Sequence, residues 1–416
     1  MKDKFFTINL ILLVLFSLPL QAADWKSAQN MHTPRGGATA VKWGHYIFVF
    51  GGKAKNNKAL KTVERYDILT DTWKKNAVPN FSKPRFNAGA IVYRNKIYLI
   101  GGRDGSSALK DVEIYDPVQN SWSEAQDLHE KREGLAVHIL GGYLHAVGGR
   151  EDYHSMINDI EWYDVSENKW KEAAWEMENP RADFFSAVFH DTLYQFGGYY
   201  YGLTRMSYRA VPLQNGYSWQ KMHIMDTGRA YGATLILKEK IYLIGGEISN
   251  GKSKLVEVYD IDKDTFGREK PLTSPRSGLT GVVAGDTLFV IGGFEGNDDT
   301  PVATVEYLVT GASPIEIEPG QGLPNSHLLA QGYPNPFNGR VVFQVQIPDN
   351  DEYRLEIFDV SGRLVKALYK GHLSRGKQYF YWDARDNHLQ TVASGVYFFI
   401  IRSAGEIQKL KIVYVR

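Results

Sequence analysis

Pairs of adjacent glycines recur through most of this chain at nearly constant spacing. The first glycines of successive pairs lie 47 to 50 residues apart, and each pair closes a short apolar run such as residues 97–100. Such runs indicate buried strands, and a repeat of about 50 residues built from short strands is typical of a propeller blade. The six pairs in register are Gly51-Gly52, Gly101-Gly102, Gly148-Gly149, Gly197-Gly198, Gly245-Gly246 and Gly292-Gly293.

The second repeat shows the order of elements within one blade. Residues 88–93 predict an inner strand (a), 97–100 a second strand (b) that ends at the glycines, and 112–116 an alternating third strand (c). Trp122 opens the fourth strand (d). The order glutamate, tyrosine, aspartate, tryptophan recurs in other repeats, but the fourth repeat has no glutamate before Tyr208.

The sixth repeat has no tryptophan after Tyr307, and the missing piece stands near the start of the chain. We therefore expect the N-terminal strand to complete the last blade, which removes two exposed sheet edges. The two matching sets are Trp25, Met31, Pro34 and Arg35 on one side and Trp170, Met177, Pro180 and Arg181 on the other.

The glycine pair followed by a spaced tyrosine and a spaced tryptophan resembles the Kelch repeat family over residues 23–310. This resemblance implies an all-β fold with a six-bladed β-propeller. Some Kelch propellers are copper oxidases that use a cysteine-modified tyrosine, but this chain of 416 residues has no cysteine. The same absence excludes disulfides, thiolate catalysis and cysteine-bound zinc. A formal net charge of +1 gives no electrostatic case for nucleic-acid binding.

The first 22 residues have the layout of a secretory signal peptide. Lys2 and Lys4 precede an apolar stretch at residues 5–20, and Gln21-Ala22-Ala23 offers a cleavage site. A membrane anchor is the rival interpretation, but polar residues and a proline interrupt the run. We expect an exported protein with no transmembrane segment in the mature chain.

The composition changes after Thr310. Residues 311–327 hold three prolines and three glycines, which predicts a linker, and residues 328–416 hold short alternating segments that predict a small immunoglobulin-like β-sandwich. Four blocks in this region resemble the type IX secretion system C-terminal sorting domain (type A), although Gly339-Arg340 replaces the usual proline-threonine. The alternative is a plain immunoglobulin-like module. The blocks are residues 333–338, 358–363, 382–383 and 394–397.

The sorting-domain resemblance implies two membrane crossings, the type IX machinery as a partner, and a secreted or outer-surface location.

Two sets of loop residues predict a binding face on the propeller. The loops that join strand d to the next strand a emerge on the same face as the b–c loops, so both sets are expected around one mouth. We expect a ring of cations there, the alternative being that the repeated arginines are structural. The d–a set is Arg35, Arg85, Arg132, Arg181, Arg229 and Arg276, and the b–c set is Lys53, Arg103, Arg150, Tyr199, Glu247 and Phe294.

Aromatic residues are expected on the same side. The run Tyr199-Tyr200-Tyr201 is unusual, and flat aromatic faces beside planar guanidinium groups suit sugars and carboxylates. Other aromatic residues expected nearby are Phe86, Tyr153, Phe184, Phe185, Tyr231 and Phe294. We predict a non-catalytic protein that binds a glycan, an anionic ligand or an acidic peptide without a cofactor. The candidate ligand residues are Arg103, Arg150, the six d–a arginines, Tyr199, Tyr200 and Phe294.

Two alternatives remain open at this stage. Residues 228–232 with the later Glu247 resemble part of the periplasmic sialic acid mutarotases, which implies Glu247 as a proton shuttle and Arg229 as a carboxylate clamp. The long insertions of those enzymes are absent. The other alternative is a structural surface protein. No metal site is predicted, because the aspartates at 260–264 lack the glycine and glutamate of a calcium loop and alternate strands should scatter the histidines.

Overall fold

The computed structural model describes residues 24–213, 216–310, 329–333, 337, 341–348, 350–373, 375–387, 390–403 and 407–415. These residues form β-strands and a single 3-10 turn, η1 (Lys55–Asn57). Within these ranges, no helix has the length and hydrophobicity needed to cross a bilayer. The predicted signal peptide and linker lie outside the described residues.

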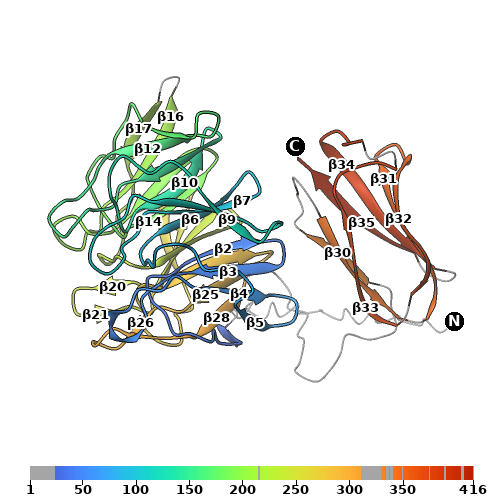
Figure 1. The fold of residues 1–416 in the computed structure, drawn as a ribbon, viewed down its shortest axis with the longest axis horizontal. Helices are drawn as coiled ribbons and strands as arrows, with labels where there is room; N and C mark the ends of the chain where they lie inside the picture. Colours follow the sequence, from blue (N-terminus) through green and yellow to red (C-terminus); the bar gives the residue numbers. More distant parts are fainter. Residues whose placement is uncertain are drawn as a thin grey trace, which may run out of the picture.

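Residues 24–310 form six four-stranded antiparallel sheets arranged as the blades of a propeller (Figure 1). Blade 1 holds β2 (Thr39–Trp43), β3 (Tyr46–Phe50), β4 (Val63–Asp67) and β5 (Thr72–Lys75). Blade 2 holds β6 (Gly89–Tyr93), β7 (Lys96–Ile100), β8 (Val112–Asp116) and β9 (Ser121–Glu124). Blade 3 holds β10 (Ala136–Leu140), β11 (Tyr143–Val147), β12 (Ile160–Asp164) and β13 (Lys169–Glu172).

The remaining blades follow the same order. Blade 4 holds β14 (Phe185–Phe189), β15 (Thr192–Phe196), β16 (Ser207–Leu213) and β17 (Gly216–Lys221). Blade 5 holds β18 (Ala233–Leu237), β19 (Lys240–Ile244), β22 (Val256–Asp260) and β23 (Thr265–Glu269). Blade 6 holds β24 (Thr280–Ala284), β25 (Thr287–Ile291), β28 (Val305–Val309) and β1 (Lys26–Ala28). Two small hairpins sit on blades 5 and 6, namely β20 (Glu247–Ile248) with β21 (Gly251–Lys252) and β26 (Phe294–Glu295) with β27 (Thr300–Pro301).

The first strand closes the ring, as the sequence predicts. Strand β1 pairs antiparallel with β28, with Lys26 opposite Tyr307. Trp25 is buried and donates its indole N–H to the carbonyl of Lys270 at 2.8 Å. The last blade therefore combines residues from both ends of the propeller sequence, and no blade depends on a strand from outside residues 24–310.

A closed ring of backbone hydrogen bonds surrounds the central channel. Each blade contributes one residue with a positive φ, and its N–H donates to the carbonyl of the equivalent residue in the preceding blade over 2.7 to 2.9 Å. The circle closes where Gly37 donates to Gly278 at 2.7 Å. We call this set the channel ring; it consists of Gly37, Asn87, Gly134, Asp183, Tyr231 and Gly278.

The propeller core lies between neighbouring blades, and the glycine pairs allow the blades to approach. Phe48 and Phe50 of blade 1 pack in one apolar cluster with Ile97 and Leu99 of blade 2. At the edge of this interface Gly51 has a φ of +60°, and a Cβ there would lie 2.2 Å from the carbonyl oxygen of Arg85. A side chain is excluded both by the left-handed backbone and by the neighbouring blade.

The fourth blade departs from the register predicted for it. Tyr208 lies opposite Gln195, just as Glu64 lies opposite Val49 in blade 1. Tyr208 therefore occupies the position of the repeat glutamate and not that of the repeat tyrosine, which Ala210 takes. The hairpin of β16 and β17 is also longer than its counterparts in the other blades.

The C-terminal domain is a β-sandwich of two antiparallel sheets. One sheet has the order β29 (Leu329–Tyr333), β30 (Val341–Ile347) and β33 (Gly376–Trp382). The other has the order β32 (Leu364–Leu373), β31 (Asp351–Asp359), β34 (Gly395–Arg402) and β35 (Ile407–Tyr414). Side chains from both sheets form one core, in which Phe343 and Phe399 stack with ring centroids 3.9 Å apart.

A candidate ligand pocket at one mouth of the propeller

The six repeated arginines are buried and do not line the mouth. In blade 2 the guanidinium of Arg85 donates to the carbonyls of Gly101 at 3.0 Å and Asp111 at 3.1 Å and pairs with Glu113 at 2.6 Å. Arg35, Arg132, Arg229 and Arg276 form the same kind of ion pair, with Glu64, Glu161, Glu257 and Glu306 respectively. The predicted ring of exposed cations is therefore wrong for Arg35, Arg85, Arg132, Arg181, Arg229 and Arg276, all at most 1% exposed.

The physical reason is that each of these loops turns inward beneath the glycine pair. The glutamate on strand c of the same repeat accepts hydrogen bonds from the guanidinium and from backbone N–H groups of the d–a loop, as Glu64 does from His32 and Thr33 at 2.8 and 2.9 Å. A buried charge of this kind needs a partner and satisfied hydrogen bonds. The repeated arginine and glutamate together fix the loop to its blade.

Arg181 in blade 4 is the exception, since Tyr208 replaces the glutamate. The guanidinium of Arg181 donates to the carbonyl of Gly197 at 3.0 Å and lies 5.2 Å from the centre of the Tyr208 ring. Burial lowers the pKa of Arg181 to about 10. Blade 4 thus keeps the buried cation but has no carboxylate opposite it.

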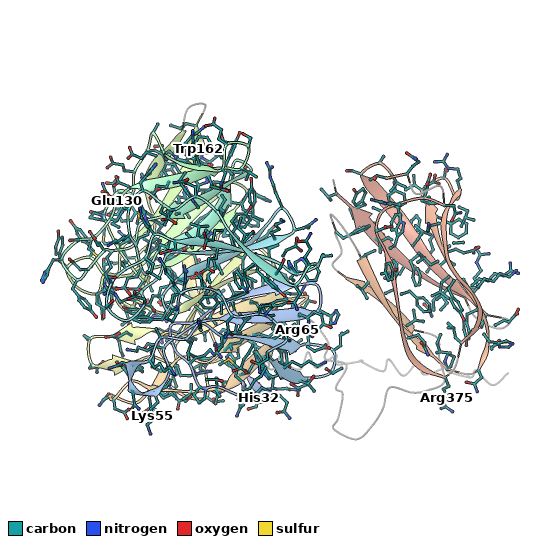
Figure 2. The ribbon with its side chains drawn as sticks, in the orientation of Figure 1. His32, Lys55, Arg65, Glu130, Trp162 and Arg375 are labelled. Carbon is teal, nitrogen blue, oxygen red and sulfur yellow. The ribbon has the colours of Figure 1, made fainter. Side chains whose placement is uncertain are left out.

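The residue after each glycine pair, by contrast, does reach the mouth. Each forms a β-bridge with a d–a loop, for example Lys53 with Gly36 and Phe294 with Ser277, so the two kinds of loop share one face as predicted. Figure 2 shows Lys55 of a b–c loop and Glu130 of a d–a loop on the same side of the propeller. Six blades therefore deliver one side chain each to this mouth, namely Lys53, Arg103, Arg150, Tyr199, Glu247 and Phe294.

These side chains surround a pocket of about 730 Å³, which we call the mouth pocket. A pocket of this size suits a small ligand or a short segment of a larger one. Its other lining residues are Asn57, Phe86, Asn87, Gly105, Glu133, Tyr153, Met156, Tyr201, Gly202, Tyr231, Ser277 and Asp299. The predicted Tyr200, Phe184 and Phe185 are not among them: Tyr200 is exposed but does not line the pocket, and the two phenylalanines are buried.

On one side of the mouth pocket, Arg103 and Arg150 are held by the protein itself. Arg103 donates from Nε to Glu133 at 2.7 Å and from its other two nitrogens to the carbonyls of Ser106 and Glu151, both at 2.9 Å. Arg150 pairs with Asp183 at 3.0 Å and with Glu133 at 3.3 Å, and it donates to the Tyr231 hydroxyl. The result is a chain of alternating charges across blades 2 to 4.

Burial shifts the pKa of two groups in this set, Asp183 and Tyr231. The side chain of Asp183 is only 3% exposed, and burial raises its pKa to about 7 against the opposing effect of Arg150. Burial also raises the pKa of Tyr231 well above its ordinary value, with a further rise from Asp183. Tyr231 has a φ of 57°, at a channel-ring position that other blades fill with glycine, asparagine or aspartate. Such backbone strain in a bulky residue costs about 1–3 kcal/mol and concentrates at functional sites.

The other side of the mouth pocket is lined by aromatic rings and by the charged side chains of Lys53 and Glu247. The ammonium of Lys53 lies 5.1 Å from the ring centre of Phe294 and 5.7 Å from that of Phe86, and no ion pair joins it to a residue that the structure describes. The Phe294 ring covers Gly36, where a Cβ would lie 2.4 Å from it. Glu247 contacts the Tyr199 hydroxyl, whose pKa is raised first by burial and then by this carboxylate.

Sequence reasoning missed Glu133 and Asp183. A signal was available, because each repeated arginine is followed two residues later by a channel-ring residue, and Glu133 and Asp183 are the acidic members of these tripeptides.

The histidines are also less scattered than predicted, since His138 and His145 lie opposite each other on β10 and β11. Within the described parts of the chain, no three His, Asp or Glu residues cluster closely enough to hold a metal ion.

The mutarotase-like pair predicted from the sequence is not assembled. Glu247 lines the mouth pocket, but Arg229 is fully buried and bound to Glu257. The predicted role of Arg229 as a carboxylate clamp is therefore wrong, since its guanidinium has no access to the pocket.

Comparison with known families follows the two-domain division. Residues 8–202 match the KLHDC2/KLHL20/DRC7 Kelch-repeats domain, residues 228–271 match the Kelch motif, and residues 331–415 match the secretion system C-terminal sorting domain. The chain is a Kelch-repeat protein with a C-terminal sorting domain. A Kelch propeller joined to a type IX sorting domain supports an exported protein that is secreted or held at the cell surface.

Individual Kelch proteins are similar in sequence to this chain. Kelch-like protein 25 of Xenopus tropicalis is 27% identical over 246 residues, which cover 57% of this chain and 41% of that protein. Beta-scruin of Limulus polyphemus is 25% identical over 306 residues, covering 70% of this chain and 28% of that protein. The chain thus matches less than half of the length of these relatives. A solved structure, "Structure of YjhT", superposes with a TM-score of 0.59 at 16% identity over 67% of this chain and 95% of its own, which supports the propeller fold.

Proposed function

We propose that the Kelch propeller of this exported protein binds a ligand in the mouth pocket without catalysing a reaction on it. The observation that carries the proposal is that all six blades place their post-glycine side chain around one cavity, and that these six side chains are of five different residue types. A purely structural position would repeat, as the six buried arginines do. The post-glycine position is geometrically equivalent in all six blades, yet its residue type varies. This variation favours recognition of an asymmetric ligand.

The chemistry of the lining favours a glycan or another polar ring that carries one acidic group. The lining residues hold three cations, Lys53, Arg103 and Arg150, and three acids, Glu133, Glu247 and Asp299. This balance disfavours a polyanion. Lys53 is the cation with no carboxylate partner among the described residues, so it is the natural contact for an acidic group.

The exposed aromatic rings supply the remaining contacts. Tyr153 is 75% exposed and Tyr201 is 80% exposed at the rim, and Arg150 lies 5.0 Å from the Tyr153 ring centre. Such rings stack on sugar rings or on apolar parts of a peptide. Arg103 and Arg150 act mainly by positioning Glu133, Asp183 and Tyr231, because each of their nitrogens already has a partner in the protein.

An array of glycans and peptides probed with the full-length protein tests this proposal. We expect binding to a glycan that carries a carboxylate, and loss of that binding in Lys53→Met and Tyr153→Ala. Matched controls are Lys74→Met, an exposed lysine on β5, and Tyr143→Ala, an exposed tyrosine outside the pocket. Binding only to peptides would show that the ligand is a peptide and not a glycan. Binding to nothing on the array would favour a structural surface protein. Catalysis by Glu247 and Arg229 is not proposed, because the pair is separated.

A further inference from the structure

The outer face of the four-stranded sheet in the sorting domain carries apolar residues that a solvent-facing sheet normally lacks. Along β31 and β34, alternate residues such as Leu355 and Phe399 are buried in the core, and the residues between them point outward. The outward positions include Phe358, Phe398 and Ile400, all half-buried. Antiparallel sheets with one face in water usually alternate apolar with polar residues, so this outer face departs from the rule.

The strand register places these residues in rows across the sheet. One row runs from Leu364 through Phe358 and Phe398 to Lys411, and the row beside it contains Glu356, Ile400 and Lys409. The next row consists of Lys370, Arg354, Arg402 and Ile407. An apolar centre is therefore flanked by cations on the same face. We call this set the outer face.

The charge of the outer face is strongly one-sided. Its cations are Arg354, Lys370, Arg402, Lys409 and Lys411, and its acids are Glu352 and Glu356. Two ion pairs of this domain, Arg363 with Asp359 and Arg385 with Asp383, lie in turns and not on this face.

Two of the cations rest on the aromatic rings of the face. The ammonium of Lys409 is 3.8 Å from the ring centre of Phe398, and the guanidinium of Arg402 is 5.6 Å from that of Phe358. Neither Lys409 nor Arg402 forms an ion pair with a described residue.

We propose that the outer face is the surface by which the secretion machinery holds the sorting domain, and that the partner presents an acidic protein surface with apolar residues at its centre. The proposal rests on delivery through the sorting domain, which the match of residues 331–415 to the secretion system C-terminal sorting domain supports. An acidic partner gains from the surplus of cations, whereas a basic one would be repelled. Covering Phe358, Phe398 and Ile400 supplies the apolar part of the contact.

The geometry favours a protein partner over a membrane. The apolar side chains lie on the two central strands, β31 and β34, and the cations Lys409 and Arg402 lie over the rings of Phe398 and Phe358. Insertion into a bilayer requires apolar side chains that reach deeper than the charged groups beside them. An apolar patch bordered by charged groups is instead the usual anatomy of a protein interface.

The test uses the full chain in a host with type IX secretion and measures the fraction of the protein that reaches the medium or cell surface. We expect Arg402→Glu/Lys409→Glu to lower this fraction about tenfold or more, since the reversal places like charges opposite each other across the contact. The matched control is Arg385→Glu, an exposed arginine of the same domain away from the outer face. A second charge reversal, Arg354→Glu/Lys370→Glu, ensures that the conclusion does not rest on one variant. Thermal melts of the purified proteins show whether each variant is folded.

Each result has a defined meaning. If the folded reversal variants are delivered as efficiently as the wild type, the proposal is overturned. If deletion of residues 329–415 leaves delivery unchanged, delivery through the sorting domain itself is ruled out. Vesicles of phosphatidylcholine and phosphatidylglycerol provide the last arm: binding by the wild type that the reversals abolish would identify a membrane surface and overturn the protein partner.

Discussion

Gly37 donates its backbone N–H to the carbonyl of Gly278 at 2.7 Å, and this bond closes the channel ring between the first and sixth blades. The two residues come from opposite ends of the propeller sequence, as do Lys26 and Tyr307 in the last blade. Closure at two levels, in the outer strand and around the channel, fixes the mouth at which the six post-glycine residues meet.

Replacement of Trp25 by alanine should destabilise the whole propeller. The indole is buried against blades 5 and 6 and donates to Lys270, so its loss leaves a cavity and an unpaired carbonyl. We expect a loss of about 3–5 kcal/mol in the free energy of unfolding, measured by urea denaturation. Trp162→Ala, at a half-buried tryptophan on β12, serves as the control and should cost clearly less. Equal losses would contradict closure by the first strand.

Gly51→Ala should be far more damaging than Gly44→Ala. Both glycines have a φ near +60°, but an alanine Cβ at Gly51 would lie 2.2 Å from the Arg85 carbonyl oxygen, whereas Gly44 has nothing within 4 Å. The comparison separates backbone strain, worth about 1 kcal/mol, from the close approach of two blades. Thermal melts of the two variants provide the measurement. Similar melting temperatures would show that the blades do not need the glycine pair for contact.

Arg132→Met should destabilise the protein more than Arg181→Met. Removal of Arg132 leaves Glu161 buried without its partner, which typically costs about 3–5 kcal/mol. Removal of Arg181 leaves no buried carboxylate without a partner, because Tyr208 occupies the position of the repeat glutamate in blade 4. Denaturation midpoints of the two variants should therefore differ in this order. The reverse order would mean that the Arg–Glu pairs are not what fixes the d–a loops.

Asp183 should make the propeller less stable as the pH rises from about 4 to about 7. Its folded pKa is raised by burial from 3.8 to about 7, so in this range the native state binds a proton that the unfolded state has released. Stability from this group is complete at low pH, falls through the window and is level above it. Asp183→Asn should flatten the profile over the same range, while Arg150, Glu133 and Tyr231 remain in place. A profile unchanged by Asp183→Asn would show that Asp183 is ionised throughout.

The fold was predictable because its signals repeat. Six glycine pairs in register define the blades, and the absent tryptophan after Tyr307 together with Trp25 predicts the closing strand. The register of blade 4 was not predicted correctly. Tyr208 stands eleven residues before Trp219, whereas Tyr66 stands seven before Trp73, and this longer interval reflects the extended hairpin of β16 and β17.

The site was only partly predictable. The post-glycine residues were placed correctly at the mouth, because strand b always ends at the same height in its blade. The repeated arginines were misplaced, since a charged residue in a loop suggests exposure and its burial depends on Glu64 and its equivalents two strands away. The fact that arginine and glutamate occur together in five repeats was the available clue. The links from Arg150 to Asp183 and Tyr231 join three blades and leave no local pattern.

The most direct test of the account is calorimetric titration of the full-length protein with the glycan selected on the array, compared between the wild type and Lys53→Met, with Lys74→Met as the control. We expect a measurable affinity that falls at least about tenfold in Lys53→Met and stays unchanged in Lys74→Met. An affinity that is equal in all three proteins would place the ligand elsewhere and contradict recognition in the mouth pocket.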